Sequence, residues 1–116
     1  MEKANIQVDF DKMEDMLSLF RKDSRAKFSF NIELPNGDII VDFGSDGHII
    51  GLEFFNASSY FPLLKNLVNQ KINAKMSIQY GKEWAQIYYE ISVPEKNIML
   101  KQSIVSPYGK ELIVAH

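Results

Sequence analysis

Apolar and polar residues alternate with a period of two along most of the chain. The alternation is clearest at Ile6, Val8 and Phe10; at Phe28, Phe30, Ile32 and Leu34; at Ala74, Met76, Ile78 and Tyr80; and at Ile87, Tyr89, Ile91 and Val93. Successive side chains of a β-strand point to opposite faces of a sheet, so this period predicts strands that are buried on one face only. With further strands over 98–105 and 111–115, we expect about nine strands, joined by hairpins and ending in a meander.

Two turn sequences divide the first half of the chain. Pro35-Asn36-Gly37-Asp38 joins a residue that fixes φ to residues that tolerate positive φ. Asp46-Gly47 lies between two apolar runs, which is a strong hairpin signal. We therefore predict a structural turn at Asp46 and Gly47, with Gly47 at positive φ.

The hairpin over 38–55 sorts its residues onto two faces. A loop of two residues (46–47) or of four residues (44–47) gives the same sorting. The first face is wholly apolar and is predicted to belong to the core: Ile39, Val41, Phe43, Ile50, Leu52 and Phe54. The second face mixes acids with apolar residues, and we expect it to be partly covered: Asp38, Ile40, Asp42, Ile49, Gly51, Glu53 and Phe55.

Two other segments fit helical spacing. A leucine-rich stripe follows Pro62, and it predicts a helix near 60–69 that packs on a sheet face. The segment 11–20 fits either a helix or a hairpin that turns at 11–14 and continues as a strand. The predicted fold is α+β, with mostly antiparallel hairpins and a meander, one helix near 60–69, and a single domain over 1–116.

Composition and charge narrow the picture further. The 116 residues are 46% hydrophobic and 24% charged, as in globular proteins, and there is no cysteine for a disulfide or a thiolate metal site. No apolar signal segment follows Met1, and no apolar run could cross a membrane, so we expect a cytoplasmic protein. The net charge of −2 combines an acidic first half with a basic second half. This asymmetry could draw the halves together, within or between chains, or reflect chance on solvated faces.

The residues around the hairpin resemble a known family. Residues 41–58 are similar to the signature of the Domain of Unknown Function 2283 family, although Gly44 stands where that signature has an acidic residue. Residues 10–17 resemble the start of the same family, with Phe10 in place of Tyr. The resemblance covers roughly 6–60 and leaves the extension over 61–116 unexplained. It implies a β-rich fold, a strand over 15–20 and no settled activity. Some members are suspected of accompanying toxin-like proteins, which implies a partner-binding role.

The acidic face of the hairpin is the main candidate for chemistry. Asp38, Asp42 and Glu53 share that face and could provide a carboxylate pair for acid–base work. Residues 42–53 also match several positions of a calcium loop, but Gly44 removes one oxygen ligand and the flanks are strands. We therefore favour solvated acids on a hairpin, and we expect no metal and no cofactor.

Other polar or aromatic residues give weaker signals. His48 and His116 lack the partners of a metal site, so we expect surface histidines. Lys75, Lys101 and Tyr88 lie on the polar face of the meander, but the acidic net charge and the small number of arginines argue against nucleic acid as a partner. The single tryptophan, Trp84, is expected to begin a strand and to be mostly buried.

The sequence does not identify a specific function. The favoured hypothesis is a small non-enzymatic module that self-associates, as a homodimer, or binds a protein partner. Ile40, Ile49 and Phe55 are the candidate interface, because a chain this small has few elements left to cover them. The alternative is a small metal-dependent or hydrolase-like enzyme that uses the Asp42/Glu53 face.

Overall fold

The computed structural model describes residues 4–108, and their backbone forms one antiparallel sheet of eight strands. The strands are β1 (Ala4–Asp11), β2 (Met16–Arg21), β3 (Phe28–Ile32), β4 (Ile39–Phe43), β5 (Ile49–Phe55), β6 (Asn73–Tyr80), β7 (Trp84–Val93) and β8 (Ile98–Pro107). They are hydrogen-bonded in the order β3-β4-β5-β2-β1-β6-β7-β8. The sheet therefore has two edges, β3 and β8.

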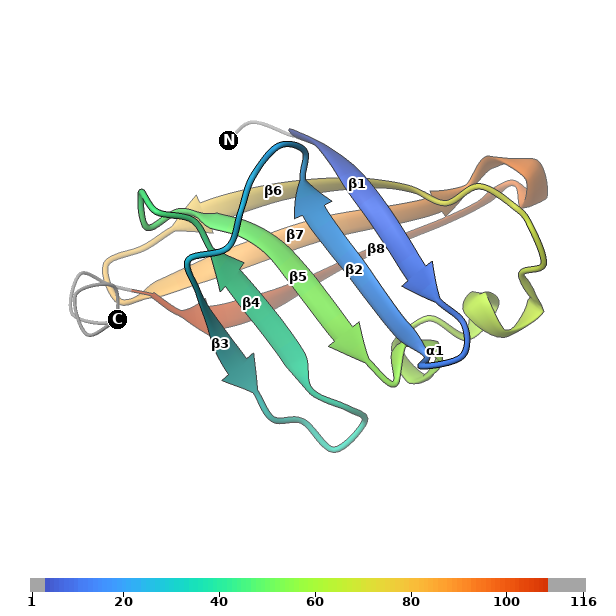
Figure 1. Cartoon of the computed structure of the whole chain (residues 1–116), viewed down its shortest axis with the longest axis horizontal. Helices are drawn as coiled ribbons and strands as arrows, with labels where there is room; N and C mark the ends of the chain where they lie inside the picture. The colour runs from blue at the N-terminus through green and yellow to red at the C-terminus, as the bar shows by residue number, and fades with distance from the viewer. Residues whose placement is uncertain (1–3, 109–116) are drawn as a thin grey trace.

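The sheet curls into two layers. In Figure 1, β3, β4, β5, β2 and β1 form a front layer, and β6, β7 and β8 cross behind it. The inward side chains of both layers make one core, because each strand presents every second residue to its concave face. Its largest wholly buried side chains are Phe43, Phe54, Phe61, Leu17, Leu19, Ile39, Ile49, Leu52, Leu64, Ile87, Ile91 and Val41.

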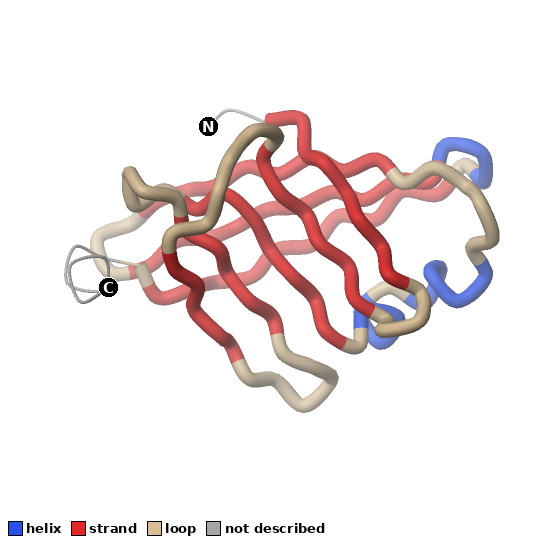
Figure 2. The backbone as a smooth tube through the Cα atoms, viewed as in Figure 1, coloured by secondary structure: helices blue, strands red, loops and turns tan. Residues whose placement is uncertain are grey.

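The prediction of an α+β fold is wrong, because the expected helix near 60–69 does not form. Its place is taken by α1 (Ala57–Tyr60) and a short 3₁₀ helix (Pro62–Asn66), and a second 3₁₀ turn covers Pro94–Lys96. Phe61 lies between the first two with extended φ and ψ of −131° and 80°, and Pro62 has no N–H to continue a helical ladder. The structure is therefore nearly all-β, as Figure 2 shows.

The apolar side chains that suggested the helix are still used in packing. Leu64 and Leu67 are buried in the core, and Leu63 packs against it, whereas Val68 is 77% exposed. Their burial requires only a compact connection between β5 and β6. The strand predicted over 111–115 lies outside the described residues.

The ambiguous segment over 11–20 is a hairpin, as the family resemblance implied. Asp15 ends its turn at φ 53°, and β2 follows directly. The Asp15 carboxylate accepts hydrogen bonds from the backbone N–H of Ser58 at 3.0 Å and from the Ser58 hydroxyl at 2.7 Å. This turn therefore holds the start of α1 against the end of the front layer.

The β4–β5 hairpin differs from the predicted sorting of faces near its turn. Its loop has three residues, Ser45 to Gly47, because Gly44 donates a backbone hydrogen bond to His48 at 2.9 Å. An odd loop places Ile49 opposite Phe43 in the core, and a β-bulge at Ile50 restores the expected register. The prediction that Ile49 lies on the outer face and Ile50 on the core face is therefore wrong.

Candidate functional site

The Asp46-Gly47 sequence forms the tip of the β4–β5 hairpin. Gly47 has a φ of 80°, and its N–H donates to the Gly44 carbonyl at 3.0 Å. The Asp46 carboxylate accepts from the backbone N–H of His48 at 3.0 Å and lies 2.8 Å from His48 Nδ1. These hydrogen bonds from His48 lower the pKa of Asp46. Asp46 therefore stabilises the turn, which is a sufficient reason for an acid at this position.

Two tyrosines from the rear layer hold the same hairpin. Tyr108 donates its hydroxyl to the Gly47 carbonyl at 3.0 Å, and the Tyr80 hydroxyl accepts from the Ile49 N–H at 2.9 Å. The Tyr108 ring also stacks on Phe43, with 5.9 Å between ring centroids. The turn is thus fixed by residues that are distant in sequence, and no local motif could reveal them.

The acidic candidate residues lie on the outer face of the front layer, but not as one group. Glu53 and Asp42 interact across β4 and β5, and Ser29 donates a hydrogen bond to Asp42 at 2.5 Å. A shallow depression of about 570 Å³ contains these three residues together with Ser18 and Ile50. Asp38 instead accepts from the Asn31 side chain at 3.2 Å, nearer the end of the sheet.

Glu53 and Asp42 form a pair that favours holding a proton. Burial raises the pKa of Glu53 to about 7, and a hydrogen bond and charge repulsion from Asp42 add to the effect. Such a pair could exchange a proton near neutral pH, but a reaction also requires a nucleophile or a bound water in place. Within residues 4–108, no group of three or more His, Cys, Asp or Glu side chains could hold a metal ion. The geometry therefore gives no positive support for an enzyme at this face.

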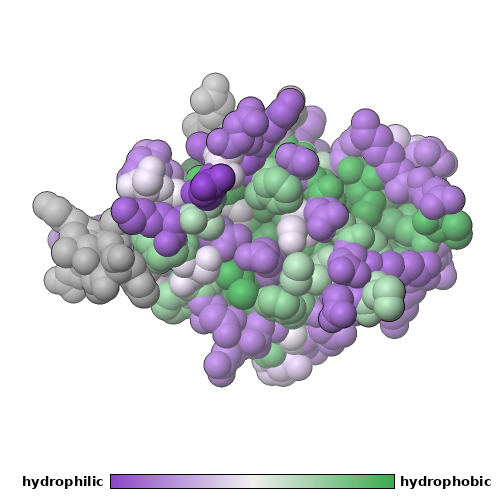
Figure 3. All heavy atoms as spheres, viewed as in Figure 1, coloured by the Kyte–Doolittle hydropathy of each residue, from purple (hydrophilic) through white to green (hydrophobic). Residues whose placement is uncertain are grey.

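The candidate interface residues are not brought together. Ile40 is half-buried opposite Glu53, and Phe55 is 38% exposed at the end of β5. Ile49 is completely buried in the core and cannot contact another molecule. Figure 3 shows this outer face as a mixture of hydrophilic and apolar side chains. The predicted interface thus loses one of its three residues.

The edge strand β8 is a more continuous surface. Its ten residues pair with β7 on one side only, and no other described strand pairs with its second side. Two apolar side chains on its outer face, Met99 and Val105, are each 60% exposed. A long strand at an edge presents unpaired main-chain N–H and C=O groups, which favour pairing with another strand. The sequence alone could not show that β8 is an edge, because strand order depends on the whole fold.

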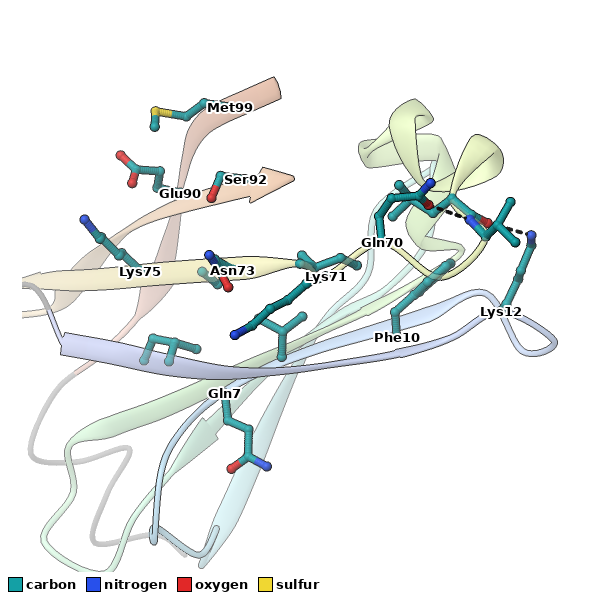
Figure 4. A pocket seen from close by; sticks show the side chains of 16 residues that line it. Gln7, Phe10, Lys12, Gln70, Lys71, Asn73, Lys75, Glu90, Ser92 and Met99 are labelled. Atoms are coloured by element: carbon teal, nitrogen blue, oxygen red, sulfur yellow. Dashed lines mark hydrogen bonds between the residues drawn. The ribbon is translucent and has the colours of Figure 1, made fainter. Parts of the chain in front are cut away.

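A groove lies where β1 and β6 diverge, and we call it the β1–β6 groove. Within residues 4–108, the two strands pair only through Ala4–Ile6 and Ala74–Met76. Beyond this short contact, a groove of about 850 Å³ opens between β1 and the segment that precedes β6, and Figure 4 shows it from close by. Its lining includes the apolar residues Ile6, Val8, Phe10, Leu67, Ile72 and Ala74, and the lysines Lys12, Lys71 and Lys75. Sequence reasoning missed this groove, since it arises from the divergence of two strands.

The polar face of the rear layer is electrostatically mixed. The register places Glu90 between Lys75 on β6 and Lys101 on β8, and Lys101 Nζ lies 3.6 Å from Glu90 Oε1. Tyr88 lies on the neighbouring pair of positions, opposite Ser77 and Ser103. An acid between two lysines weakens the positive potential that a phosphate backbone would require.

Comparison with known proteins gives a family for the front layer but no activity. The model of a family described as a protein of unknown function (DUF2283) matches residues 7–58, which extend from β1 into α1. The resemblance inferred from the sequence is thus confirmed for this part of the chain. An uncharacterized protein of Methanocaldococcus jannaschii is 29% identical over a 77-residue alignment.

That alignment spans 62% of this chain and 63% of the relative, so the chain covers less than two thirds of the relative's length. No solved structure matches the chain significantly. Among residues 4–108, no helix is long and apolar enough to cross a membrane.

Proposed function

We propose that the protein is a non-enzymatic interaction module that forms a homodimer by pairing β8 with β8 of a second copy. The observation that carries this proposal is the side of the ten-residue β8 strand with which no other described strand pairs. Pairing two edges satisfies main-chain groups that would otherwise face water and removes one open edge from each copy. A two-fold axis makes the same contact twice.

The β8 sequence is self-complementary in one antiparallel register. Centring the two-fold axis on Gln102 places Met99 of one copy opposite Val105 of the other, so that the two exposed apolar side chains cover each other. The same register places Lys101 opposite Ser103 and keeps the two lysines apart. Moving the two-fold axis by one residue, from Gln102 to Lys101, would instead place Lys101 of one copy opposite Lys101 of the other. Such a like-charge pair weakens a sheet.

The oligomeric state tests the proposal directly. Sedimentation at high micromolar concentration should give a dimer mass, and Ser103→Glu should tighten the dimer by placing an acid opposite Lys101 of the other copy. Ser103→Lys should weaken it by roughly two- to tenfold, since the like charges meet twice. Val68→Lys is the control, because Val68 is also exposed but lies outside β8.

Several results would contradict this proposal, and the first three concern the full chain. They are a monomer at every concentration, equal effects of the two Ser103 variants, and a dimer that is lost in Phe55→Glu but kept in Ser103→Lys. A full chain that stays monomeric while a variant truncated after Tyr108 dimerises would also reject it, because the edge would then be covered within one molecule.

A further inference from the structure

The turn between β3 and β4 carries an exposed asparagine, Asn36, directly before a glycine, Gly37. The turn lies at the same end of the front layer as α1 (Figure 1), and the Gly37 N–H donates a hydrogen bond to the Leu34 carbonyl at 3.1 Å. Within residues 4–108, the side-chain amide of Asn36 makes no hydrogen bond, and only the main-chain carbonyl of this residue is used. The fold therefore does not require an amide at position 36, and that amide is free to react.

Gly37, in contrast, is required by the fold. Its φ is 132°, a conformation that side chains with a Cβ atom rarely adopt, and an added Cβ would collide with the Phe55 carbonyl. Because glycine has no side chain, the main-chain nitrogen of Gly37 is not shielded on the side of Asn36. The packing against Phe55 thus fixes the one neighbour that leaves an asparagine open to attack.

The chemistry that this pair permits is an intramolecular ring closure. The Gly37 nitrogen forms a bond to Cγ of Asn36, and the bond from Cγ to Nδ2 breaks. The proton lost from the Gly37 nitrogen balances the proton that Nδ2 gains as it leaves as ammonia. Water then opens the resulting succinimide at either carbonyl, which gives aspartate or isoaspartate at position 36. Because the attacking nitrogen must lose its proton, the reaction becomes faster as the pH rises.

Hydrogen bonds from α1 and its N-cap oppose this ring closure. The Asn36 carbonyl accepts from Asn56 Nδ2 at 2.9 Å and from the Ser59 hydroxyl at 2.7 Å. The Tyr60 hydroxyl donates to the Gly37 carbonyl. Ring closure requires the peptide group between Asn36 and Gly37 to rotate, and these bonds hold the carbonyls on both sides of the Gly37 nitrogen. The turn must therefore open from α1 before the nitrogen can attack, as in a local unfolding step.

We propose that Asn36 is a site of spontaneous modification to aspartate and isoaspartate, and that the hydrogen bonds from α1 and Asn56 set its rate. The product adds a negative charge near Asp38, and isoaspartate lengthens the main chain of the turn. A longer turn no longer places both carbonyls on their donors, so the modification separates the β3–β4 turn from α1. This site is independent of the proposed β8 dimer, because β3 and β8 are opposite edges of the sheet.

The test follows the native full chain at pH 8, with the same chain in urea as the unfolded reference. Peptide mass spectrometry distinguishes asparagine, aspartate and isoaspartate at position 36. Both acids should appear, more slowly in the native chain than in urea and more slowly at lower pH, and isoaspartate identifies the succinimide route. Asn97 is the internal control, since it is also exposed and at a turn, but the β-branched side chain of Ile98 shields the following nitrogen.

A serine variant tests the control by α1. Ser59→Ala removes one hydrogen bond from the Asn36 carbonyl, so it should accelerate conversion of the native chain by about fivefold and leave the rate in urea unchanged. Ser45→Ala is the matched control, because Ser45 is an exposed serine in the β4–β5 turn. The proposal is overturned if Asn36 stays intact in the native chain, if Asn97 converts as fast as Asn36, or if the two serine variants convert at the same rate.

Discussion

Glu53 has a pKa that couples its protonation to the stability of the fold. The folded protein raises this pKa from 4.5 to about 7, first through burial and then through Asp42. A raised pKa means that the native state binds the proton more tightly than the unfolded chain does. The stabilisation from this proton is therefore complete below about pH 4.5 and is lost as the pH rises through about 7.

We predict that Glu53→Gln removes this pH dependence. The amide keeps the shape of the protonated acid and carries no charge, so the variant should be more stable than the native protein above pH 7. The gain should be only about 1 kcal/mol, because Glu53 is partly open to solvent and the repulsion is screened. Urea unfolding across the range from pH 5 to pH 8 measures it, with the exposed Glu33→Gln as control. If the free energy of unfolding changes with pH in the same way for Glu53→Gln and for the native protein, Glu53 does not hold a proton as described and the prediction is wrong.

Gly47 is required by its backbone conformation. At φ 80° a side chain with a Cβ atom is strained, so Gly47→Ala should lower the free energy of unfolding by about 1 kcal/mol or more. Gly47→Asn should cost less, because asparagine tolerates the left-handed region. Denaturant melts of both variants check the order, and a neutral alanine variant would show that the turn does not constrain this residue.

At the level of elements, local patterns predicted the strands well and the connections poorly. The period of two identified the described strands other than β2 (Met16–Arg21), which the family resemblance implied, since each strand has one face in the core. The leucines near Leu63 have the spacing of a helix, but spacing alone does not show that the helix is interrupted at Phe61-Pro62. The face of Ile49 depended on a loop of three residues, and sequence could not distinguish this from loops of two or four.

Trp84 shows a similar limit of local reasoning. It begins β7 as expected, but it is 41% exposed, so the prediction that it is mostly buried is wrong. Its indole covers Gly81 in the β6–β7 turn, where an added Cβ would lie 2.3 Å from the ring. Because Gly81 has no side chain, the indole of Trp84 can rest on its backbone.

We predict that Gly81→Ala displaces the indole. The added methyl group cannot share space with the ring, so Trp84 should become more exposed and the free energy of unfolding should fall by about 1–3 kcal/mol. Trp84 is the single tryptophan, so a red shift of the native emission reports its position without ambiguity. Unchanged emission and stability in this variant would mean that the indole does not rest on Gly81.

At the level of the whole molecule, the two layers are tied at the hairpin tip by Tyr80 and Tyr108. Tyr80→Phe should be the more damaging change, because it leaves the backbone N–H of Ile49 without its acceptor, at a cost of about 1–3 kcal/mol. Tyr108→Phe removes a donor from the Gly47 carbonyl and should cost about 1 kcal/mol. Chemical unfolding of the two variants tests this order, and an equal or reversed cost would contradict it.

The candidate sites depended on this global arrangement to different degrees. The Asp42–Glu53 contact was predictable, because two strands of one hairpin place the residues on the same face. The β1–β6 groove and the β8 edge were not, because they follow from which strands pair last and where two strands separate. Sequence patterns describe neighbours along the chain, whereas the β1–β6 groove joins segments such as those of Lys12 and Leu67, which are 55 residues apart, and the β8 edge is defined by the order of all the strands.

The short contact between β1 and β6 makes the front layer a separable half. Among the described residues, its strand pairing with the rear layer involves only Ala4–Ile6 and Ala74–Met76, and the family match over 7–58 stays within the front layer and α1. The inward side chains of the front layer, among them Leu17, Val41 and Phe54, are completely buried in the core that it shares with the rear layer. Residues 73–107 therefore cover, from within the same chain, a core face that the front layer cannot bury by itself.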